Sequence, residues 1–388
     1  MKKLMVAMAC AVCAATVMAG LYGDTPTPKH AWAVHDQNRP NPKKISAEPG
    51  VPPSDAVVLF DGTQESFEKN WCNDKGGPTK WKFVNGTLES VHRAGNICSR
   101  QQFGDVQLHV EWQPPSKVEG FGQGRGNSGV FLMGGMYEIQ VLDSWETDPA
   151  NMKNPNYADG QAGAVYGQNP PLVNPTRKPG DWQVYDIIFH QPIFNGDTLV
   201  HPGSLTVFLN GVLVQDHWEL EGPTLHMGRT QQRKPPASGK GSIQFQDHGN
   251  PVHFRNIWVR EIPSRYANTT HGTFLSNEKD VMALRRETAA KLFAKINLDN
   301  PRKQDVIAQL FEVLSYDASD KYVGELRKVA QPWLAEIAKW DKATAEQRKG
   351  ELFHVRNAAN VLYRNKVIDD TCTIRKGVLE VISKYGLK

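Results

Sequence analysis

The sequence predicts a mainly β protein, an all-β sandwich or jelly roll, followed by a bundle of α-helices. Two observations support this prediction. Between residues 56 and 262, short runs of alternating apolar and polar residues are separated by Gly, Pro and Asn, as in strands joined by turns. Beyond Pro263, apolar residues instead recur every four positions, which is typical of amphipathic helices. With 388 residues, 39% of them hydrophobic, the chain is long enough for two or three domains.

Residues 1–19 have the features of a secretory signal peptide. Three residues, two of them lysines, precede the apolar run from Leu4 to Met18, and small residues end it at Ala19. The run is too short and too rich in alanine to predict a membrane span. Cys10 and Cys13 lack the leucine-led pattern of a lipoprotein signal. We therefore expect an exported protein, periplasmic or extracellular.

Residues 20–55 are rich in Pro, Lys, Asn and Asp without an apolar period, so we expect a linker or a strap that lies over the surface. Export would leave Cys72, Cys98 and Cys372. Cys72 and Cys98 could pair in an oxidising compartment, but three cysteines do not make a disulfide framework. Free buried thiols are an equal alternative.

Composition limits the classes of partner. The formal net charge of +4 is small for this length, and no cluster of Lys and Arg with interleaved aromatics is present, which argues against a nucleic-acid partner. Ten Trp and 33 Gly are typical of turn-rich β proteins that handle sugars, although an aromatic core would have the same composition.

The β domain is predicted over residues 56–263, with hairpin turns at Asn85-Gly86 and Asn210-Gly211. The segment from Thr147 to Pro179 is long and polar, and such loops are usually functional or disordered. Since it follows the hairpin described below, we expect it to form a wall or lid of the site. Strands are predicted at Trp81–Phe83, Thr87–Val91, Val106–Trp112, Val130–Met133, Tyr137–Leu142, Trp182–Phe189, Leu205–Leu209, Gly211–Gln215, Ser242–Gln246 and Phe254–Val259.

The helical domain is predicted over residues 264–388 as a bundle of roughly four to five helices. Pro332 is predicted to kink a helix or to start one. The polar faces are expected to be solvated, and we find no set of residues there that requires chemistry. Amphipathic segments are predicted at Asp280–Ile296, Val306–Leu314, Tyr322–Ile337, Leu352–Tyr363 and Val367–Tyr385.

The stretch from Gly122 to Ser144 is the main candidate for a functional site. A glycine-rich segment leads into an apolar strand, a turn at Gly134-Gly135 and a returning strand. Side chains alternate between the faces of a strand, so Glu138 and Gln140 share one face. Asp143 would join them only through a bulge. This face is a candidate site if it lines a groove.

Three further groups could take part in chemistry. His109 and Glu111 share one face of a predicted strand, and would join Glu138 if that face lines the concavity; a solvated face is the equal alternative. Asp247 and His248 lie at a strand end, where loop residues commonly face a groove, and could bind a divalent metal together with a strand carboxylate. Arg125, between two glycines, could donate to a ligand oxygen or pair with a carboxylate inside the hairpin.

Several segments, in this order, resemble the 3-keto-disaccharide hydrolase family, and the resemblance covers about residues 56–262. The segments that carry it are Leu59-Phe60-Asp61-Gly62, Phe103-Gly104-Asp105, the run from Gly122 to Val130, the run from Tyr137 to Ser144, Trp182 to Phe189, Gln246-Asp247-His248-Gly249-Asn250, and Asn256 to Arg260. The helical tail lies outside the resemblance.

The resemblance implies a concanavalin-like or LamG-like jelly roll that acts on glycosides oxidised to a ketone at C3. A C3 ketone acidifies the C2 proton, so a base can remove it, the enolate can expel the glycosidic oxygen at C1, and water can add back. We expect Glu138 or His248 to be the base. Enolate stabilisation is expected from Arg125, Asn127 or a bound divalent cation.

Asp143 and Asp247 are expected to orient His248 or to bind that cation. Gln140 and Trp145 complete the expected substrate-binding set. The alternative function is a sugar-binding module without catalysis, in which Tyr137, Trp145 and Trp182 would stack on a carbohydrate ligand.

Overall fold

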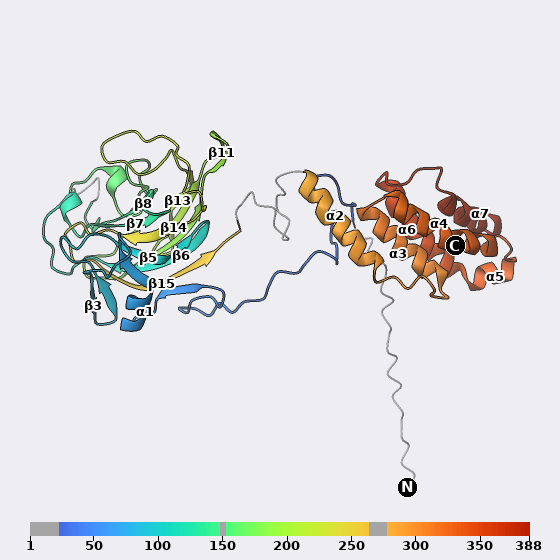
Figure 1. Ribbon diagram of the computed structural model, residues 1–388, viewed down its shortest axis with the longest axis horizontal. Helices are drawn as coiled ribbons and strands as arrows, with labels where there is room; N and C mark the ends of the chain where they lie inside the picture. Colours follow the sequence, from blue (N-terminus) through green and yellow to red (C-terminus); the bar gives the residue numbers. More distant parts are fainter. Residues whose placement is uncertain (1–22, 148–152, 264–277) are drawn as a thin grey trace, which may run out of the picture. The chain divides into compact units, whose positions relative to one another are not determined.

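The computed structural model describes residues 23–147, 153–263 and 278–388. Contacts divide the chain into two compact units: residues 44–265 form one, and the residues before Lys44 join those after Arg265 in the other (Figure 1). The predicted signal peptide, residues 1–19, and the start of the predicted helical domain, residues 264–277, lie outside the described residues. In the described part, no helix is both long and apolar enough to cross a membrane.

The first unit is a sandwich of two antiparallel sheets. The larger sheet has eight strands in the order β13-β12-β9-β6-β15-β4-β3, with β1 also paired to β15. Its strands are β1 (Val57–Phe60), β3 (Lys82–Val84), β4 (Thr87–Glu89), β6 (Val106–Gln113), β9 (Gln183–His190), β12 (Ser204–Leu209), β13 (Val212–Glu219) and β15 (His253–Glu261).

The smaller sheet has five strands in the order β2-β5-β14-β7-β8. These are β2 (Trp71–Asn73), β5 (Ile97–Phe103), β7 (Ser128–Leu132), β8 (Tyr137–Val141) and β14 (Gly241–Phe245), and the unit also contains the hairpin of β10 (Ile193–Asn195) and β11 (Thr198–His201), the helix α1 (Gln64–Asn70) and the 3-10 turns η1 (Gly122–Gly124) and η2 (Ala158–Gly160). The predicted jelly-roll sandwich followed by helices is therefore confirmed.

The alternation of buried and half-buried side chains explains why these residues form strands of the larger sheet. In β6, every second residue from Val106 is buried and those between are only half-buried, because one face packs in the core while the other is wet. Aromatic side chains fill the space between the sheets, including Phe245 and Phe254, whose stacked rings lie 4.4 Å apart. The Tyr185 hydroxyl crosses the core and donates to the Gln140 carbonyl oxygen at 2.6 Å. This bond ties β9 of one sheet to β8 of the other.

Cys72 and Cys98 are direct cross-strand neighbours in β2 and β5, and both are buried free thiols. The Cys72 thiol donates to the Cys98 carbonyl oxygen at 3.5 Å. Burial, with the neighbouring Cys72, raises the pKa of the Cys98 thiol to about 11. Of the two alternatives left open by the sequence, the structure has the free thiols.

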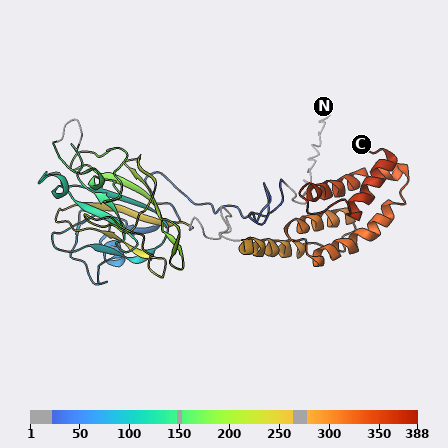
Figure 2. The same cartoon turned by 90° about the horizontal axis from the view of Figure 1, so that it is seen from above.

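The second unit contains six helices in the described residues, rather than the expected four to five (Figure 2). Pro332 lies inside α4, so no helix starts there, and the last helix begins at Thr373 instead of Val367. The helices are α2 (Glu278–Phe293), α3 (Lys303–Tyr316), α4 (Asp320–Ile337), α5 (Lys342–Gln347), α6 (Lys349–Arg364) and α7 (Thr373–Tyr385). Helix α3 is buried along most of its length, since α2, α4 and α6 all pack on it.

Part of the segment predicted as a linker or strap packs on these helices. The Trp32 ring lies edge-on to Tyr316 of α3, with centroids 6.3 Å apart. Asp36 accepts a short hydrogen bond from the Tyr316 hydroxyl, and the Asn38 amide donates to Glu312 at 2.9 Å. Residues from both ends of the chain therefore build one unit.

We predict that Trp32→Ala lowers the free energy of unfolding of the helical unit by about 2 kcal/mol, because apolar contacts with α3 are lost. Hydrogen exchange would show faster exchange in α3 and unchanged exchange in β6. Val34→Ala, at a half-exposed position on the same segment, is the control. Equal protection of α3 in both variants would contradict this account of the strap.

Candidate functional site

The hairpin of β7 and β8 places Glu138 on the face of the five-stranded sheet that points away from the core. Glu138 lies opposite Phe131, and Gln140 lies opposite Gly129, while Ile139 is fully buried on the core side. The alternation expected from the sequence is thus observed. Gln244 of β14 lies opposite Phe131, so the sheet carries Glu138, Phe131 and Gln244 in one row.

The Glu138 carboxyl group is buried, with only 4% of the residue exposed. Its carboxyl oxygen occupies space that exists because residue 129 is glycine: a Cβ there would lie 2.5 Å from Oε1. Burial raises the pKa of Glu138 to about 8, since the charged form loses its hydration. A carboxyl group with a pKa near the working pH is suited to acid and base chemistry.

A chain of three hydrogen-bonded side chains lies next to Glu138. The hydroxyls of Tyr157 and Tyr166 are 2.8 Å apart, and the Tyr166 hydroxyl is 3.0 Å from Nδ1 of His226. Tyr166 also donates its backbone N–H to the Glu138 carbonyl oxygen at 3.2 Å. Burial raises the pKa of Tyr157, as do its hydrogen bond with Tyr166 and the nearby carboxyl groups of Asp159 and Glu138. The phenol of Tyr157 therefore stays protonated at neutral pH.

These three side chains line a cleft of about 690 Å³ at the outer edge of β8. A second cleft, of about 520 Å³, is lined by Met136 and Gln244 among other residues. Tyr166, Glu138, Phe131 and Gln244 follow one another across the sheet, so Glu138 lies in the row between residues of the two clefts and is itself in the lining of neither. Both volumes are in the range of small-molecule sites.

Arg125 and Asp143 form a buried ion pair. Nε of Arg125 donates to Oδ2 of Asp143 at 2.6 Å, and the Trp145 backbone N–H donates to Oδ1 at 3.1 Å. Burial raises the pKa of Asp143, while Arg125 opposes that rise. Of the two interpretations of Arg125 left by the sequence, its geometry matches the structural pair. The Asp143 carboxylate accepts from Arg125 and Trp145, whereas the sequence led us to expect that it would orient His248.

Asn127 and Gln140 belong to a second buried network at the same end of the sheet. Gln140 donates to Oδ1 of Asn127 at 3.0 Å, and the Asn127 amide donates to the Gln123 carbonyl oxygen at 2.7 Å. The Asn127 backbone N–H donates to Oδ1 of Asn250 at 2.7 Å. These bonds hold the loop before β7 to the loop after β14.

Asp247 and His248 lie in that loop after β14. Asp247 accepts the backbone N–H groups of Gly95 and Gly249, at 3.0 and 2.9 Å, so it shapes the turn. His248 is exposed, and Trp145 is 42% exposed. The residues that the structure describes contain no group of three His, Cys, Asp or Glu side chains able to hold a metal ion.

His109 and Glu111 do not join Glu138. Both lie on β6 of the eight-stranded sheet, on its face away from the core. Nδ1 of His109 is 2.7 Å from Asp186, and its ring stacks on Trp258 with centroids 5.0 Å apart. The sequence predicted that His109 and Glu111 would join Glu138 only if their strand face lined the same concavity. It does not, because Glu138 belongs to the other sheet.

The sandwich unit matches a known protein family. The family model described as the 3-keto-alpha-glucoside-1,2-lyase-like domain matches residues 55–260, which is more than half of the chain. The chain belongs to this family. The resemblance inferred from sequence segments is thereby confirmed, and the matched residues lie in the sandwich unit.

Two relatives extend this comparison. The 3-keto-disaccharide hydrolase of Bacteroides thetaiotaomicron is 23% identical over 311 residues, which cover 67% of this chain and 99% of that protein. A crystal structure of a candidate glycosyl hydrolase from Parabacteroides distasonis is 41% identical, with a TM-score of 0.52, and covers 57% of this chain and 93% of its own.

The family domain contains site residues that sequence reasoning did not single out, namely Tyr157, Tyr166 and His226. They come from loops without periodicity, and their shared cleft forms only when these loops meet at β8. The one available signal was the long polar segment between Thr147 and Pro179. Residues of this segment, among them Tyr157 and Tyr166, line the cleft.

We predict that Arg125→Ala lowers the free energy of unfolding by about 3 to 5 kcal/mol, because it leaves the buried Asp143 carboxylate without its cation. Asp143→Ala should cost less, because Arg125 keeps Glu146 at 3.6 Å. The double variant should lose much less than the sum of the two, as measured by urea unfolding. Removing the exposed Lys117–Glu119 pair should cause no measurable change. Additive effects of the two buried substitutions would contradict a direct pair.

The raised pKa of Glu138 predicts a pH-dependent stability. The unfolded chain ionises Glu138 near its ordinary pKa of 4.5, while the folded protein holds the proton up to about 8. The stabilisation is therefore complete below pH 4.5 and is lost as pH rises to 8, by at most about 1.4 kcal/mol per pH unit. Glu138→Gln should remove this loss, so its advantage over the native chain in urea unfolding should grow from pH 5 to pH 8. A constant difference would contradict the prediction.

Proposed function

We propose that the sandwich unit cleaves glycosides that carry a ketone at C3, by removal of the C2 proton, elimination and rehydration. The observation that carries this proposal is the buried Glu138 carboxyl group between two clefts, with a pKa near 8. Membership of the 3-keto-alpha-glucoside-1,2-lyase-like family supports the substrate class, as does the activity named for the Bacteroides relative.

The position after Glu138 on the same face favours elimination over ordinary glycoside hydrolysis. A retaining glycosidase needs two carboxyl groups about 5 Å apart. Here the next side chain on that face of β8 is the amide of Gln140, and Asp143 is paired with Arg125. A single base suffices when the substrate already carries a ketone.

In the proposed reaction, the ionised Glu138 removes the proton at C2, and the electron pair moves into the C3 carbonyl to form an enolate. The enolate collapses and breaks the bond between C1 and the glycosidic oxygen, which leaves with a proton as an alcohol. The remaining sugar has a double bond between C1 and C2. Water then adds its oxygen to C1 and a proton to C2, so the net reaction is hydrolysis.

Tyr157, Tyr166 and His226 are proposed to serve the two oxygens that gain charge. Tyr157 keeps its proton, since its pKa is raised, and can donate a hydrogen bond to an enolate oxygen. His226 is joined to it through Tyr166 and can supply a proton to the leaving oxygen. These roles replace those expected for Arg125 and Asn127, whose side chains already form hydrogen bonds within the protein, to Asp143 and Gln123.

We predict that the purified protein releases monosaccharide from 3-keto-trehalose or 3-keto-lactose, and none from the unoxidised sugars. Only about a tenth of Glu138 is ionised at pH 7 if its pKa is about 8, so kcat/KM should rise with pH up to that value. Glu138→Gln should lower kcat by about 100-fold or more. Product release is measured by chromatography.

Several controls separate the candidate roles. Glu119→Gln changes an exposed glutamate on a loop and should leave kcat unchanged. His248→Ala tests whether His248, the other candidate base, takes part. A chelator tests whether a divalent cation takes part. Full activity of Glu138→Gln, together with loss in His248→Ala, would transfer the role of base to His248. Cleavage of the unoxidised sugars would overturn the elimination chemistry.

A sugar-binding module without catalysis is the second candidate function. The exposed indole of Trp145 and the 45% exposed ring of Tyr157 favour it, because sugars stack on such rings. Binding of both oxidised and unoxidised sugars without cleavage would support this function instead.

We also propose that the protein acts outside the cytoplasm, on the basis of its N-terminal 19 residues. Cell fractionation of a producing bacterium should find the chain, shortened at its N-terminus, in the periplasm or the medium. Full-length protein in the cytoplasm would contradict this proposal.

A further inference from the structure

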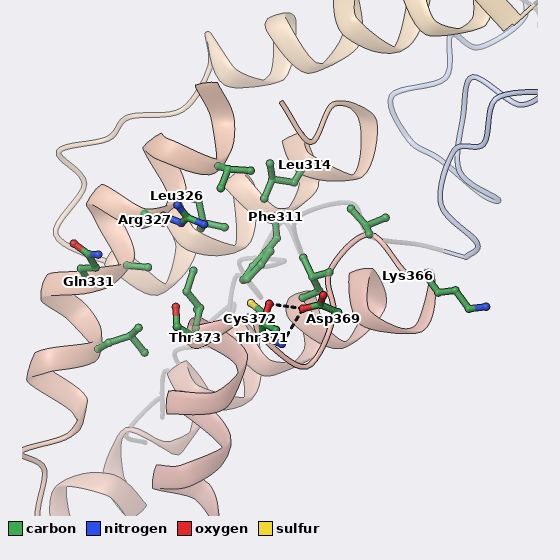
Figure 3. A pocket seen from close by; sticks show the side chains of 16 residues that line it. Phe311, Leu314, Leu326, Arg327, Gln331, Lys366, Asp369, Thr371, Cys372 and Thr373 are labelled. Atoms are coloured by element: carbon green, nitrogen blue, oxygen red, sulfur yellow. Dashed lines mark hydrogen bonds between the residues drawn. The ribbon is translucent and has the colours of Figure 1, made fainter. Parts of the chain in front are cut away.

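The helical unit contains a cavity of about 520 Å³ between α3, α4, α7 and the loop before α7 (Figure 3). Its shape follows from how α4 and α7 pack. They approach closely at Gly377, where an added Cβ would lie 3.0 Å from Cδ2 of Leu334. Towards the start of α7 the chain leaves as the loop that contains Val367 and Ile368, and this loop closes the space instead of a helix.

The floor of the cavity is apolar. Phe311 and Leu314 of α3 and Leu326 of α4 are almost fully buried, and Ile374 of α7 closes the far side. Other apolar side chains on the wall are only half-buried, Val367 among them. They keep apolar surface in contact with water that a ligand would cover, and apolar surface of this kind favours binding.

The rim is polar and carries more positive than negative charge. Arg327 and Gln331 lie one turn apart on α4, and among the described residues no carboxylate pairs with Arg327. Lys366 extends away from the other labelled side chains (Figure 3). The one carboxylate of the rim, Asp369, is held by the backbone N–H and hydroxyl of Thr371, at 2.8 and 2.5 Å. Arg327 is thus the cation left to meet a ligand.

We propose that this cavity binds a small organic anion with an apolar body, such as a medium-chain aliphatic carboxylate. The aliphatic chain would lie on Phe311, Leu326 and Ile374, and the carboxylate would accept hydrogen bonds from Arg327 and Gln331 at the rim. An apolar floor with one guanidinium at its edge matches a single anionic group better than a neutral or cationic one. The site is separate from Glu138 and does not depend on the proposed reaction.

The thiol of Cys372 provides a direct test, because it lines the cavity and is half-buried, while Cys72 and Cys98 are buried in the sandwich. The full chain is titrated with decanoate, and binding is measured by calorimetry. In parallel, alkylation of Cys372 is followed by mass spectrometry of its peptide. Saturable binding with matching protection of Cys372 is expected, and decanol should bind at least about tenfold more weakly.

Two variants locate the ligand. Arg327→Gln changes an exposed position and should weaken decanoate binding about tenfold or more, with little effect on decanol. Arg286→Gln, with the same loss of charge on the exposed face of α2, is the matched control and should bind as the native chain does. Val367→Phe should fill part of the cavity and weaken binding of both compounds.

Three results would overturn the proposal: no saturable binding up to about 10 mM decanoate, equal affinity for decanoate and decanol, or unchanged binding in Arg327→Gln. If Val367→Phe does not fold, the comparison of Arg327→Gln with Arg286→Gln still tests the proposal, because both positions are exposed.

Discussion

The burial of one carboxyl group on the face of a sheet that points away from the core is the constraint on which the proposed site depends. Glu138 stands over Gly129, and the absence of a side chain there makes room for the carboxyl group. Burial then keeps the group neutral to about pH 8. The register of β7 and β8 sets this arrangement, since a shift by one residue would turn Glu138 into the core.

Two buried carboxyl groups only five residues apart have different tasks in this hairpin. Asp143 is matched by the guanidinium of Arg125, so its charge is compensated and it fixes the end of β8. No cation among the described residues pairs with Glu138, and burial raises the pKa of its carboxyl group to about 8. Loops that share no sequence pattern bring Tyr157 and Tyr166 to the edge of β8, where the Tyr166 backbone N–H donates to the Glu138 carbonyl oxygen. Asp143 thus supports the strand that presents Glu138, the base of the proposed reaction.

Much of the fold could be predicted from periodicity, because alternation and four-residue spacing follow directly from strand and helix geometry. The strand of Glu138 and its outward face were found in this way. Strand β5 was missed since Ile97 to Phe103 has no clean alternation, and β2 is too short to show one. A carboxylate partner inside the hairpin was one of two interpretations of Arg125, but its identity as Asp143 depends on how the loop folds. The cleft of Tyr157 and His226 was indicated only by a long polar segment, because its residues meet only in three dimensions.

The central claim is that a proton leaves C2 before the glycosidic bond breaks. The most direct measurement is cleavage of 3-keto-trehalose in D2O, with deuterium in the released 3-keto sugar located by NMR at early times. The hydrogen at C4, which also neighbours the ketone, reports exchange without the enzyme. We expect deuterium at C2 in each molecule of product and little at C4. Cleavage that leaves hydrogen at C2 would show direct displacement at C1 and contradict the account.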